Sequence, residues 1–431
     1  MKKRKLLVLA LAAVMLLGLL AGCGGNNNGK GSVYWLNFKP EADEVLQQVA
    51  KMYTDKTGVS VKVVTAASGN YRATLLSEMD KSAPPTLFVV GPSGVAEWSD
   101  FALDLKGTAI ANELSTDAYS MYDESGKLVS IGYCYEAFGI IVNADLLEQA
   151  GYKVADIKNF AALKTAAEDI HARAAELGFD AFTSNDMDDS SSWRYTGHMI
   201  NLDYYYEEQD AGVTWMDTPD TITGAYVDNY RNLYDLCVEN SLVSRDALAT
   251  GGHDAEAEFK DGKAVFFVQG SWEYGAVAGA VPSATMIPYY CGVAGEEKAG
   301  LNCGTENCWA INAKASEADQ KATMDFLVWL VTDSEASEMI TNGEGGFGVM
   351  PYKSAAASKN GFLAAANEYT ANGCYVMDWA FNYQPNNNVD YRAALVSVLN
   401  QYNADPSDAN WEQVRTAIVD GWATQAALAK G

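Results

Sequence analysis

The sequence predicts an α/β protein that is divided into two lobes. Strand-like and helix-like segments alternate between residues 32 and 90, and the strand-like segments are almost continuously apolar. This pattern is typical of a parallel sheet that is covered by helices on both faces. Beyond residue 22 the chain has 409 residues, which is more than one hydrophobic core usually serves. Two lobes are therefore the expected organisation.

The first elements follow from local patterns. Residues 32–36 are apolar and β-rich, which predicts a strand. Residues 41–57 predict a helix, because apolar side chains recur at helical spacing and Gly58 supplies a stop signal. By the same criteria we expect a second strand at 59–64, a second helix at 71–79 and a third strand at 86–90.

The rest of the chain is predicted to be mostly helical, with short strands between the helices. The glycine-rich segment 342–348 contains a literal GxGxxG, but it follows a predicted helix and not a strand. It therefore indicates a loop between lobes and not a dinucleotide site. We expect helices at 160–177, 226–239, 318–331, 389–402 and 411–428, and strands at 138–142, 264–269 and 282–290.

The N-terminus predicts export. Residues 1–5 carry four basic side chains, and an apolar run of 16 residues follows from Leu6 to Ala21. A basic start before a short apolar run is typical of a signal peptide, whereas a membrane-spanning helix needs about 20 residues. Removal of the signal changes the formal net charge from −26 to −30. A chain so acidic is not expected to bind nucleic acid or an anionic membrane surface through a basic patch.

The residues around Cys23 predict a lipid anchor. Leu20-Ala21-Gly22-Cys23 resembles a bacterial lipobox, which implies that residues 1–22 are removed and that Cys23 is lipidated, with palmitate as an acyl group. Residues 23–32 are polar and rich in glycine and asparagine, so they predict a flexible tether. The alternatives are an ordinary secretory signal with an incidental Cys and an uncleaved anchor. We expect a soluble domain held by lipid at the extracytoplasmic face of the cell membrane.

Few residues carry a recognisable reaction chemistry. The three histidines lie in no HExxH or GxSxG motif, so no catalytic residue, metal site or cofactor is expected. Asp186–Ser190 resembles the start of a calcium loop but lacks its later Gly and Glu, which favours a solvated acidic loop. Six further cysteines permit either free thiols or disulfides. They are Cys134, Cys237, Cys291, Cys303, Cys308 and Cys374.

Several segments, taken in order, resemble the extracellular solute-binding proteins (family 1) of carbohydrate ABC transporters. Residues 136–147 (EAFGIIVNADLL) resemble the first crossing of that family between its lobes. Residues 259–272 (FKDGKAVFFVQGSW) are similar to a family segment that ends in Trp, and residues 310–314 and 348–351 resemble the second and third crossings. Residues 33–61 resemble the opening strand–helix–strand, although Thr86 stands where the family usually has Asp.

The resemblance implies a two-lobe periplasmic-binding-protein-like fold of the class II type, with three hinge crossings and a plan similar to that of the maltose-binding protein. It places residues 33–135 plus 311–348 in the N-terminal lobe and residues 136–310 plus 351–431 in the C-terminal lobe. It also implies a non-catalytic receptor, expected to be a monomer, that captures a mono- or oligosaccharide in the cleft. The receptor would deliver this ligand to a membrane permease that is powered by a cytoplasmic ATPase.

Candidate ligand-binding residues come from the resemblance and from sugar chemistry. Sugars offer apolar C–H faces and a rim of hydroxyls, so a site needs flat aromatic rings with carboxylates or amides. The resemblance implies that Trp272 stacks on a sugar ring and that Glu136 accepts hydrogen bonds from hydroxyls. For Glu136 the alternative is a structural salt bridge at the hinge.

Other candidates are placed by their sequence context. Trp193 and Trp379 lie in polar, irregular stretches. Asn37, Phe38 and Lys39 leave the first strand at its C-terminal end, where open α/β sheets bind ligands. Trp35, Trp98 and Trp215 are further aromatic candidates, each of which could equally serve a core.

Two other functions are weighed against sugar binding. The same fold could bind a polyamine, a metal or a phosphate ester, which the aromatic-rich candidate set disfavours. A secreted glycan-processing enzyme would need two carboxylates about 5–9.5 Å apart, and no motif pairs two of them.

Overall fold

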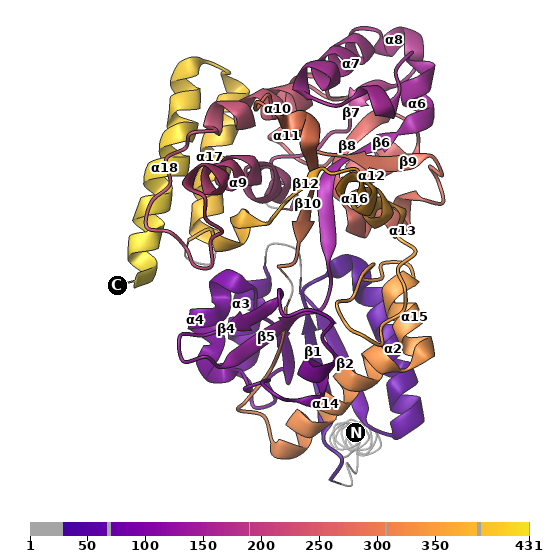
Figure 1. Cartoon of the computed structure of the whole chain (residues 1–431), viewed down its shortest axis with the longest axis vertical. Coiled ribbons are helices and arrows are strands. Elements are labelled where there is room, and N and C mark those ends of the chain that lie inside the picture. The colour runs from indigo at the N-terminus through magenta and orange to yellow at the C-terminus, as the bar shows by residue number, and fades with distance from the viewer. Residues whose placement is uncertain (1–28, 67–69, 189, 307, 386–388, 431) are drawn as a thin grey trace, which may run out of the picture.

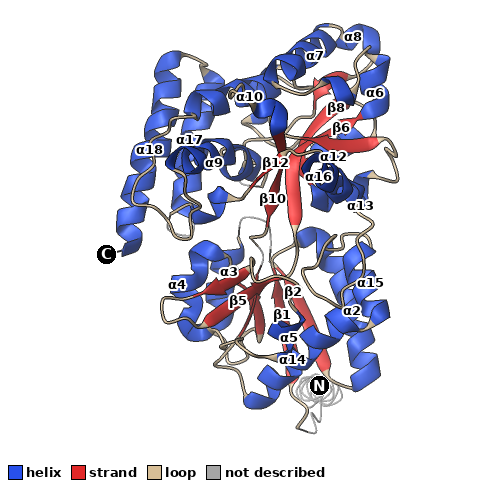
Figure 2. Ribbon diagram, viewed as in Figure 1, coloured by secondary structure: helices blue, strands red, loops and turns tan. Residues whose placement is uncertain are grey.

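The computed structural model describes residues 29–66, 70–188, 190–306, 308–385 and 389–430. In these ranges the chain forms two lobes, one above the other in Figure 1, and each lobe has its own sheet with helices around it (Figure 2). The prediction of a two-lobe α/β protein is confirmed. Residues 1–22, Cys23 and most of the predicted tether lie outside the described residues. No helix in the described part of the chain is long and apolar enough to cross a membrane.

The sheet of the N-terminal lobe has the strand order β2-β1-β3-β11-β5-β4. β1 pairs in parallel with β2 and β3, as predicted, but β11 is antiparallel to β3 and β5. The prediction of a parallel sheet is therefore wrong beyond β3, because β11 returns from the other lobe in the opposite direction. The strands are β1 (Ser32–Asn37), β2 (Ser60–Thr65), β3 (Leu87–Val89), β4 (Ser120–Tyr122), β5 (Leu128–Gly132) and β11 (Cys308–Ile311).

Helices cover both faces of this sheet. On one face α2, α14 and α15 enclose a core around Trp35 and Trp309, whose rings meet edge to face with centroids 5.8 Å apart. On the other face Leu75 of α3 and Trp98 of α4 pack against Phe88. The α-helices of this lobe are α2 (Asp43–Thr57), α3 (Tyr71–Met79), α4 (Val95–Trp98), α5 (Ala109–Glu113), α14 (Glu317–Thr332) and α15 (Ser334–Asn342).

The sheet of the C-terminal lobe has the order β12-β10-β6-β8-β7, and β9 also pairs with β6. β6 is buried along all of its eight residues and is antiparallel to β8, β9 and β10. It extends the strand that the sequence predicted at 138–142. The strands are β6 (Glu136–Asn143), β7 (Asp180–Phe182), β8 (Ala264–Gly270), β9 (Ala284–Ile287), β10 (Ala299–Gly304) and β12 (Tyr375–Met377).

The predicted long helices of this lobe are present, with one division. The helix expected at 160–177 is interrupted at Arg173 and forms two elements, α7 and α8. A π-helix at Arg194–Met199 was not predicted. The α-helices are α6 (Ala144–Gln149), α7 (Phe160–Ala172), α8 (Ala174–Leu177), α9 (Asn201–Ala211), α10 (Val227–Glu239), α11 (Arg245–Leu248), α12 (Ala255–Lys260), α13 (Tyr274–Val277), α16 (Gly361–Ala371), α17 (Val389–Ala404) and α18 (Asp408–Lys430).

The chain crosses between the lobes three times, but two predicted boundaries require correction. The first crossing joins β5 to β6. The second joins β10 to β11, so it precedes Cys308 and the predicted boundary after residue 310 is too late. Met350 and Tyr352 pack in the core of the N-terminal lobe, so the predicted return at residue 351 is too early. Sheet pairing and core packing decide lobe membership, and neither is contained in a motif.

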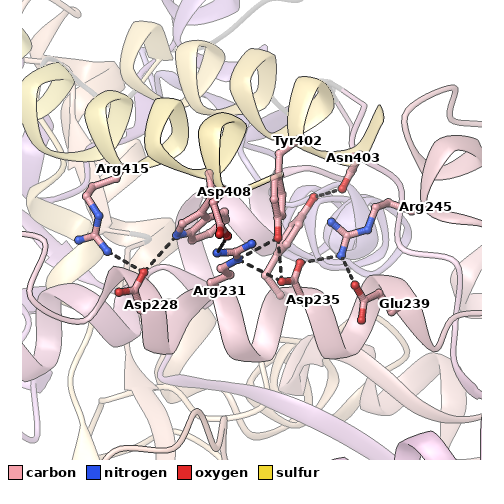
Figure 3. A network of polar contacts seen from close by, with 11 residues as sticks. Asp228, Arg231, Asp235, Glu239, Arg245, Tyr402, Asn403, Asp408 and Arg415 are labelled. Carbon is pink, nitrogen blue, oxygen red and sulfur yellow. Dashed lines mark hydrogen bonds and ion pairs between the residues drawn. The ribbon is translucent and has the colours of Figure 1, made fainter. Parts of the chain in front are cut away.

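A network of polar contacts holds the hairpin of α17 and α18 on α10 (Figure 3). Arg231 of α10 donates to the hydroxyl of Tyr402 (2.9 Å) and pairs with Asp408 (2.9 Å). Tyr402 in turn donates to Asp235 (2.8 Å), which also accepts from Arg245 (2.6 Å). Contacts that connect several elements restrain their relative positions. This network therefore restrains the position of α17 relative to α10 and α11.

The structure decides two local features, the state of the cysteines and the position of Asp186. The six cysteines from Cys134 to Cys374 are free thiols, which decides between the two alternatives. Asp186 does not lie in a solvated loop, because it is only 2% exposed. It accepts a hydrogen bond from the backbone of His253 (2.9 Å) and lies 2.7 Å from the Nδ1 atom of that residue. This pairing holds Asp186 in the interior, whereas Ser190 at the end of the same segment is exposed.

Candidate ligand-binding cleft

A cleft of about 540 Å³ lies between the lobes, within the range of about 300–1,000 Å³ that is usual for small-molecule sites. Segments that follow β1 and β3 contribute to it, because the carboxyl ends of parallel strands meet at one edge of a sheet. The N-terminal lobe supplies Phe38, Lys39, Glu41, Tyr71, Arg72 and Trp98. The crossings and the C-terminal lobe supply Glu136, Trp193, His198, Trp272, Glu306 and Arg392.

Lys39 and Glu136 form an ion pair that connects the lobes. The Nζ atom of Lys39 lies 2.7 Å from Oε1 of Glu136 and 2.9 Å from Oε1 of Glu41. Lys39 is 4% exposed and Glu136 is 2% exposed. Lys39 follows β1 of the N-terminal lobe, and Glu136 is the first residue of β6. The alternative expected for Glu136, a salt bridge at the hinge, is therefore present in the structure.

Asn37 and the neighbouring carboxylates determine the position and charge of Lys39. The Nδ2 atom of Asn37 donates to the carbonyl of Lys39 (2.6 Å), and its Oδ1 accepts from the N–H of Lys39 (3.0 Å). Burial lowers the pKa of Lys39, but the carboxylates of Glu136 and Glu41 outweigh burial and hold it well above its usual value. The ammonium group is therefore charged at neutral pH.

Aromatic rings form one wall of the cleft. The rings of Trp193 and Trp272 are tilted by 56° with centroids 5.8 Å apart, and both are half-buried. The ring of His198 lies 5.4 Å from Trp272 and stacks on Phe138 at 4.2 Å. The ammonium of Lys39 lies 5.7 Å from the centroid of Trp272, within reach of a cation–π interaction. These contacts give the wall flat, partly accessible faces of fixed orientation.

His198 is a neutral group in this wall. Burial lowers its pKa well below the usual value, and the positive charges of Arg392, Arg194 and Lys39 lower it further. A neutral imidazole has one donor and one acceptor nitrogen. His198 can therefore exchange hydrogen bonds with hydroxyl groups at physiological pH.

The opposite wall belongs to the N-terminal lobe. Phe38 and Tyr71 pack edge to face with centroids 5.4 Å apart. Arg72 donates from Nε and Nη2 to the two carboxylate oxygens of Glu97, at 3.2 and 2.8 Å. This fork geometry is the preferred one for a guanidinium and a carboxylate, and it fixes the orientation of both groups.

The predicted site residues fall into two groups. Five of them line the cleft, namely Trp272, Glu136, Trp193, Phe38 and Lys39. Asn37 and Trp379 are buried behind it, at 0% and 4% exposure, Asn37 against Lys39 and Trp379 against Phe138 and His198. Of the other Trp candidates, Trp98 lines the cleft, Trp35 lies in a core and Trp215 packs on Trp422. Ligand contact by the lining residues stays a prediction.

Several other lining residues carry no signal in the sequence. His198 lies in the π-helix, Glu306 in the second crossing and Arg392 on α17. None of them belongs to a recognisable motif, and nearly 200 residues separate His198 from Arg392. Only the packing of α17 beside the π-helix brings these two together. Among the described residues, no three His, Cys, Asp or Glu side chains are arranged to hold a metal ion.

The fold and the inter-lobe cleft define a two-lobe binding protein, and comparisons with known proteins agree. Residues 48–371 match the family described as bacterial extracellular solute-binding protein. The chain therefore belongs to this family of extracellular solute-binding proteins. No curated protein sequence matches the chain significantly.

Solved structures share the fold at low sequence identity. RafE in complex with raffinose has a TM-score of 0.70 and 16% identity, over 92% of this chain and 99% of that chain. A sugar transporter from Bacillus licheniformis in complex with stachyose has a TM-score of 0.67 and 14% identity, over 91% and 100%. Maltose-bound MalE3 from T. maritima has a TM-score of 0.64 and 15% identity, over 90% and 98%.

Proposed function

We propose that this protein captures a mono- or oligosaccharide in the cleft and turns over no substrate. The observation that carries the proposal is the composition of the cleft, which combines flat aromatic rings with hydrogen-bonding groups. Sugars need this combination, because their C–H faces pack on rings and their hydroxyls need donors and acceptors. The solved structures of similar fold that contain raffinose, stachyose and maltose support the same ligand class.

The charges of the cleft favour a neutral ligand. Glu136 and Glu41 contact Lys39, and Glu97 is held by Arg72. A polyamine needs carboxylates that are available to it, and a phosphate ester needs available cations. Most of the charged groups in this cleft already neutralise one another. A sugar requires no net charge, so this pattern suits it best.

A ligand screen tests the sugar proposal directly. A ligand that binds the folded state raises the melting temperature with concentration, as mass action requires. The purified domain, residues 33–431, is heated with maltotriose, raffinose, stachyose, chitotriose and xylotriose, and with spermidine, ferric ion and glucose 6-phosphate. Stabilisation by at least one sugar is expected, with the sugar recovered intact by chromatography. Stabilisation by spermidine, ferric ion or the phosphate ester alone would contradict the proposal, and cleavage of the sugar would indicate an enzyme.

We further propose that the protein is a lipid-anchored monomer that delivers its ligand to a membrane permease driven by a cytoplasmic ATPase. The lipobox-like residues that end in Cys23 support the anchor, and membership of the solute-binding family supports the delivery. Stable attachment needs more than one acyl chain, and the lipidated Cys23 would supply these chains. Cys23→Ser is therefore expected to release the protein from membranes. Sugar affinity should be unchanged, because the tether separates the anchor from the lobes. Continued sedimentation of the Cys23→Ser protein with membranes would contradict the anchor.

A further inference from the structure

Arg392 is the cleft residue whose placement the charge pairs described above do not explain. It projects from the first turn of α17 and lines the cleft opposite the N-terminal lobe. Lys39 contacts two carboxylates and Arg72 contacts one, whereas no ion pair within 4.0 Å joins the Arg392 guanidinium to a carboxylate of the described residues, although the charge of Glu306 acts on it. Its Nη2 atom is buried and has no hydrogen-bond partner among the described residues. A buried donor without a partner is costly, and at the wall of a cleft a ligand can supply the missing acceptor.

The guanidinium of Arg392 is held firmly in this position. Its Nε atom donates to Oε1 of Gln384 at 2.6 Å, and its central carbon lies 5.6 Å from the ring centroid of Phe381. Gln384 is itself fully buried and donates to the carbonyl of Thr196 at 2.8 Å. Gly197 leaves the space that the group needs, because a Cβ atom there would lie 3.0 Å from the guanidinium. A donor fork anchored on several sides is preorganised for one ligand geometry.

Glu306 supplies the complementary acceptor. It lies in the second crossing and lines the same cleft as Arg392. The neighbouring Thr305 carbonyl accepts a hydrogen bond from Asn382 at 2.9 Å, and the backbone oxygen of Glu306 would lie 2.8 Å from a Cβ atom at Gly91. Residues 305–306 therefore contact both lobes. A carboxylate accepts hydrogen bonds from hydroxyls but cannot donate to them.

We propose that Arg392 and Glu306 determine specificity by holding two neighbouring hydroxyls of one sugar ring, the first as donor to an oxygen and the second as acceptor of a hydroxyl proton. This inference rests on the proposed sugar-binding function and names the part of the sugar that is read. A sugar without one of the two hydroxyls leaves a buried polar group unpaired, and the site therefore rejects it.

The test compares variants of the domain used in the ligand screen, residues 33–431, by isothermal titration calorimetry. The first probe is the sugar of the screen that stabilises the wild type most, and the second probes are its mono-deoxy analogues. Arg392→Gln and Glu306→Gln keep the approximate size of each side chain. Arg392→Lys keeps the charge but removes the planar fork. Arg173→Gln is the matched control, because Arg173 lies between α7 and α8, does not line the cleft and pairs with Asp169 at 3.0 Å.

The wild type is expected to bind the parent sugar at least tenfold more tightly than one deoxy analogue. Arg392→Gln, Arg392→Lys and Glu306→Gln should each bind the parent sugar at least tenfold more weakly and lose most of this discrimination, while Arg173→Gln matches the wild type. Loss of discrimination separates a reading role from a merely structural one, and circular dichroism confirms that each variant is folded. If the folded Arg392 and Glu306 variants kept wild-type affinity and discrimination, this inference would be overturned, but the proposed sugar-binding function would not.

Two other outcomes would also overturn it. Tighter binding of a uronic-acid oligomer than of its neutral counterpart would mean that Arg392 holds a carboxylate and not a diol. Failure of the wild type to bind any sugar would overturn the proposed function itself, which is a different result from normal binding by the variants.

Discussion

The buried pair of Lys39 and Glu136 supports a prediction about the stability of the free protein. The family resemblance implies only that Glu136 accepts hydrogen bonds from sugar hydroxyls. In the structure the carboxylate already holds an ammonium group at 2.7 Å, with both side chains almost inaccessible to water. We therefore expect substitution of either residue to destabilise the free protein.

The magnitude follows from the surroundings of each group. Two unit charges at 2.7 Å attract by about 6 kcal/mol at an effective dielectric constant of about 20, but desolvation offsets much of this. Loss of one partner from a buried pair typically costs about 3–5 kcal/mol, which is the expected loss for Lys39→Met. Glu136→Gln should cost less, about 2 kcal/mol, because Glu41 still contacts the ammonium at 2.9 Å. The double variant should lose about 2 kcal/mol less than the sum of the single variants.

Urea unfolding at pH 7, with linear extrapolation, measures the three variants. The matched control is the cycle of Lys51→Met and Asp55→Asn, an exposed pair on α2 with side chains 76% and 64% accessible. Exposed pairs of this spacing contribute about 0.3–0.5 kcal/mol, so the control cycle should be nearly additive. Equal, small coupling in both cycles would refute the reasoning that burial makes the inter-lobe pair strong.

Two other predictions address the aromatic wall and the acidic helix α9. Trp272→Ala should weaken sugar binding by at least about 2 kcal/mol in calorimetry. Because the ring is half-buried, the substitution should cost less stability than the ~3–5 kcal/mol typical of a fully buried aromatic residue. Full affinity with a strongly lowered melting temperature would assign the ring to the core. Burial and the neighbouring Glu207 raise the pKa of Asp203 from 3.8 to about 8. The folded state then holds a proton that the unfolded state releases, so this group lowers stability as pH rises from about 4 to 8, by up to about 1.4 kcal/mol per pH unit. Asp203→Asn should therefore lose less stability than the wild type between pH 5 and 8 in thermal unfolding, and parallel curves would contradict this.

Local patterns in the sequence were sufficient for most elements. The helix expected at 71–79 has the same bounds in the structure, and the strand and helix expected at 32–57 shift by at most two residues. Apolar periodicity and glycine stops act within a few residues of the chain, so they can be read without knowledge of the fold. Two family-like motifs singled out Glu136, at the start of β6, and Trp272, just after β8. Both residues line the cleft.

Contacts between distant segments could not be predicted in this way. The pairing of β11 with β3 and β5 corrected the boundary after residue 310, because the direction and sheet of a strand depend on its partners. Trp379 and Trp193 have similar polar surroundings in sequence, yet one is buried behind the cleft and the other lines it.

The sequence by itself determined the class of fold, the order of its elements and the type of chemistry available for a ligand. Tertiary structure alone decided that Lys39 neutralises Glu136 and that His198, Glu306 and Arg392 line the same cleft. The physical reason is the range of the interactions. Secondary structure depends on neighbours a few residues apart, whereas a binding site depends on side chains that only the packing of two lobes brings within a few ångströms.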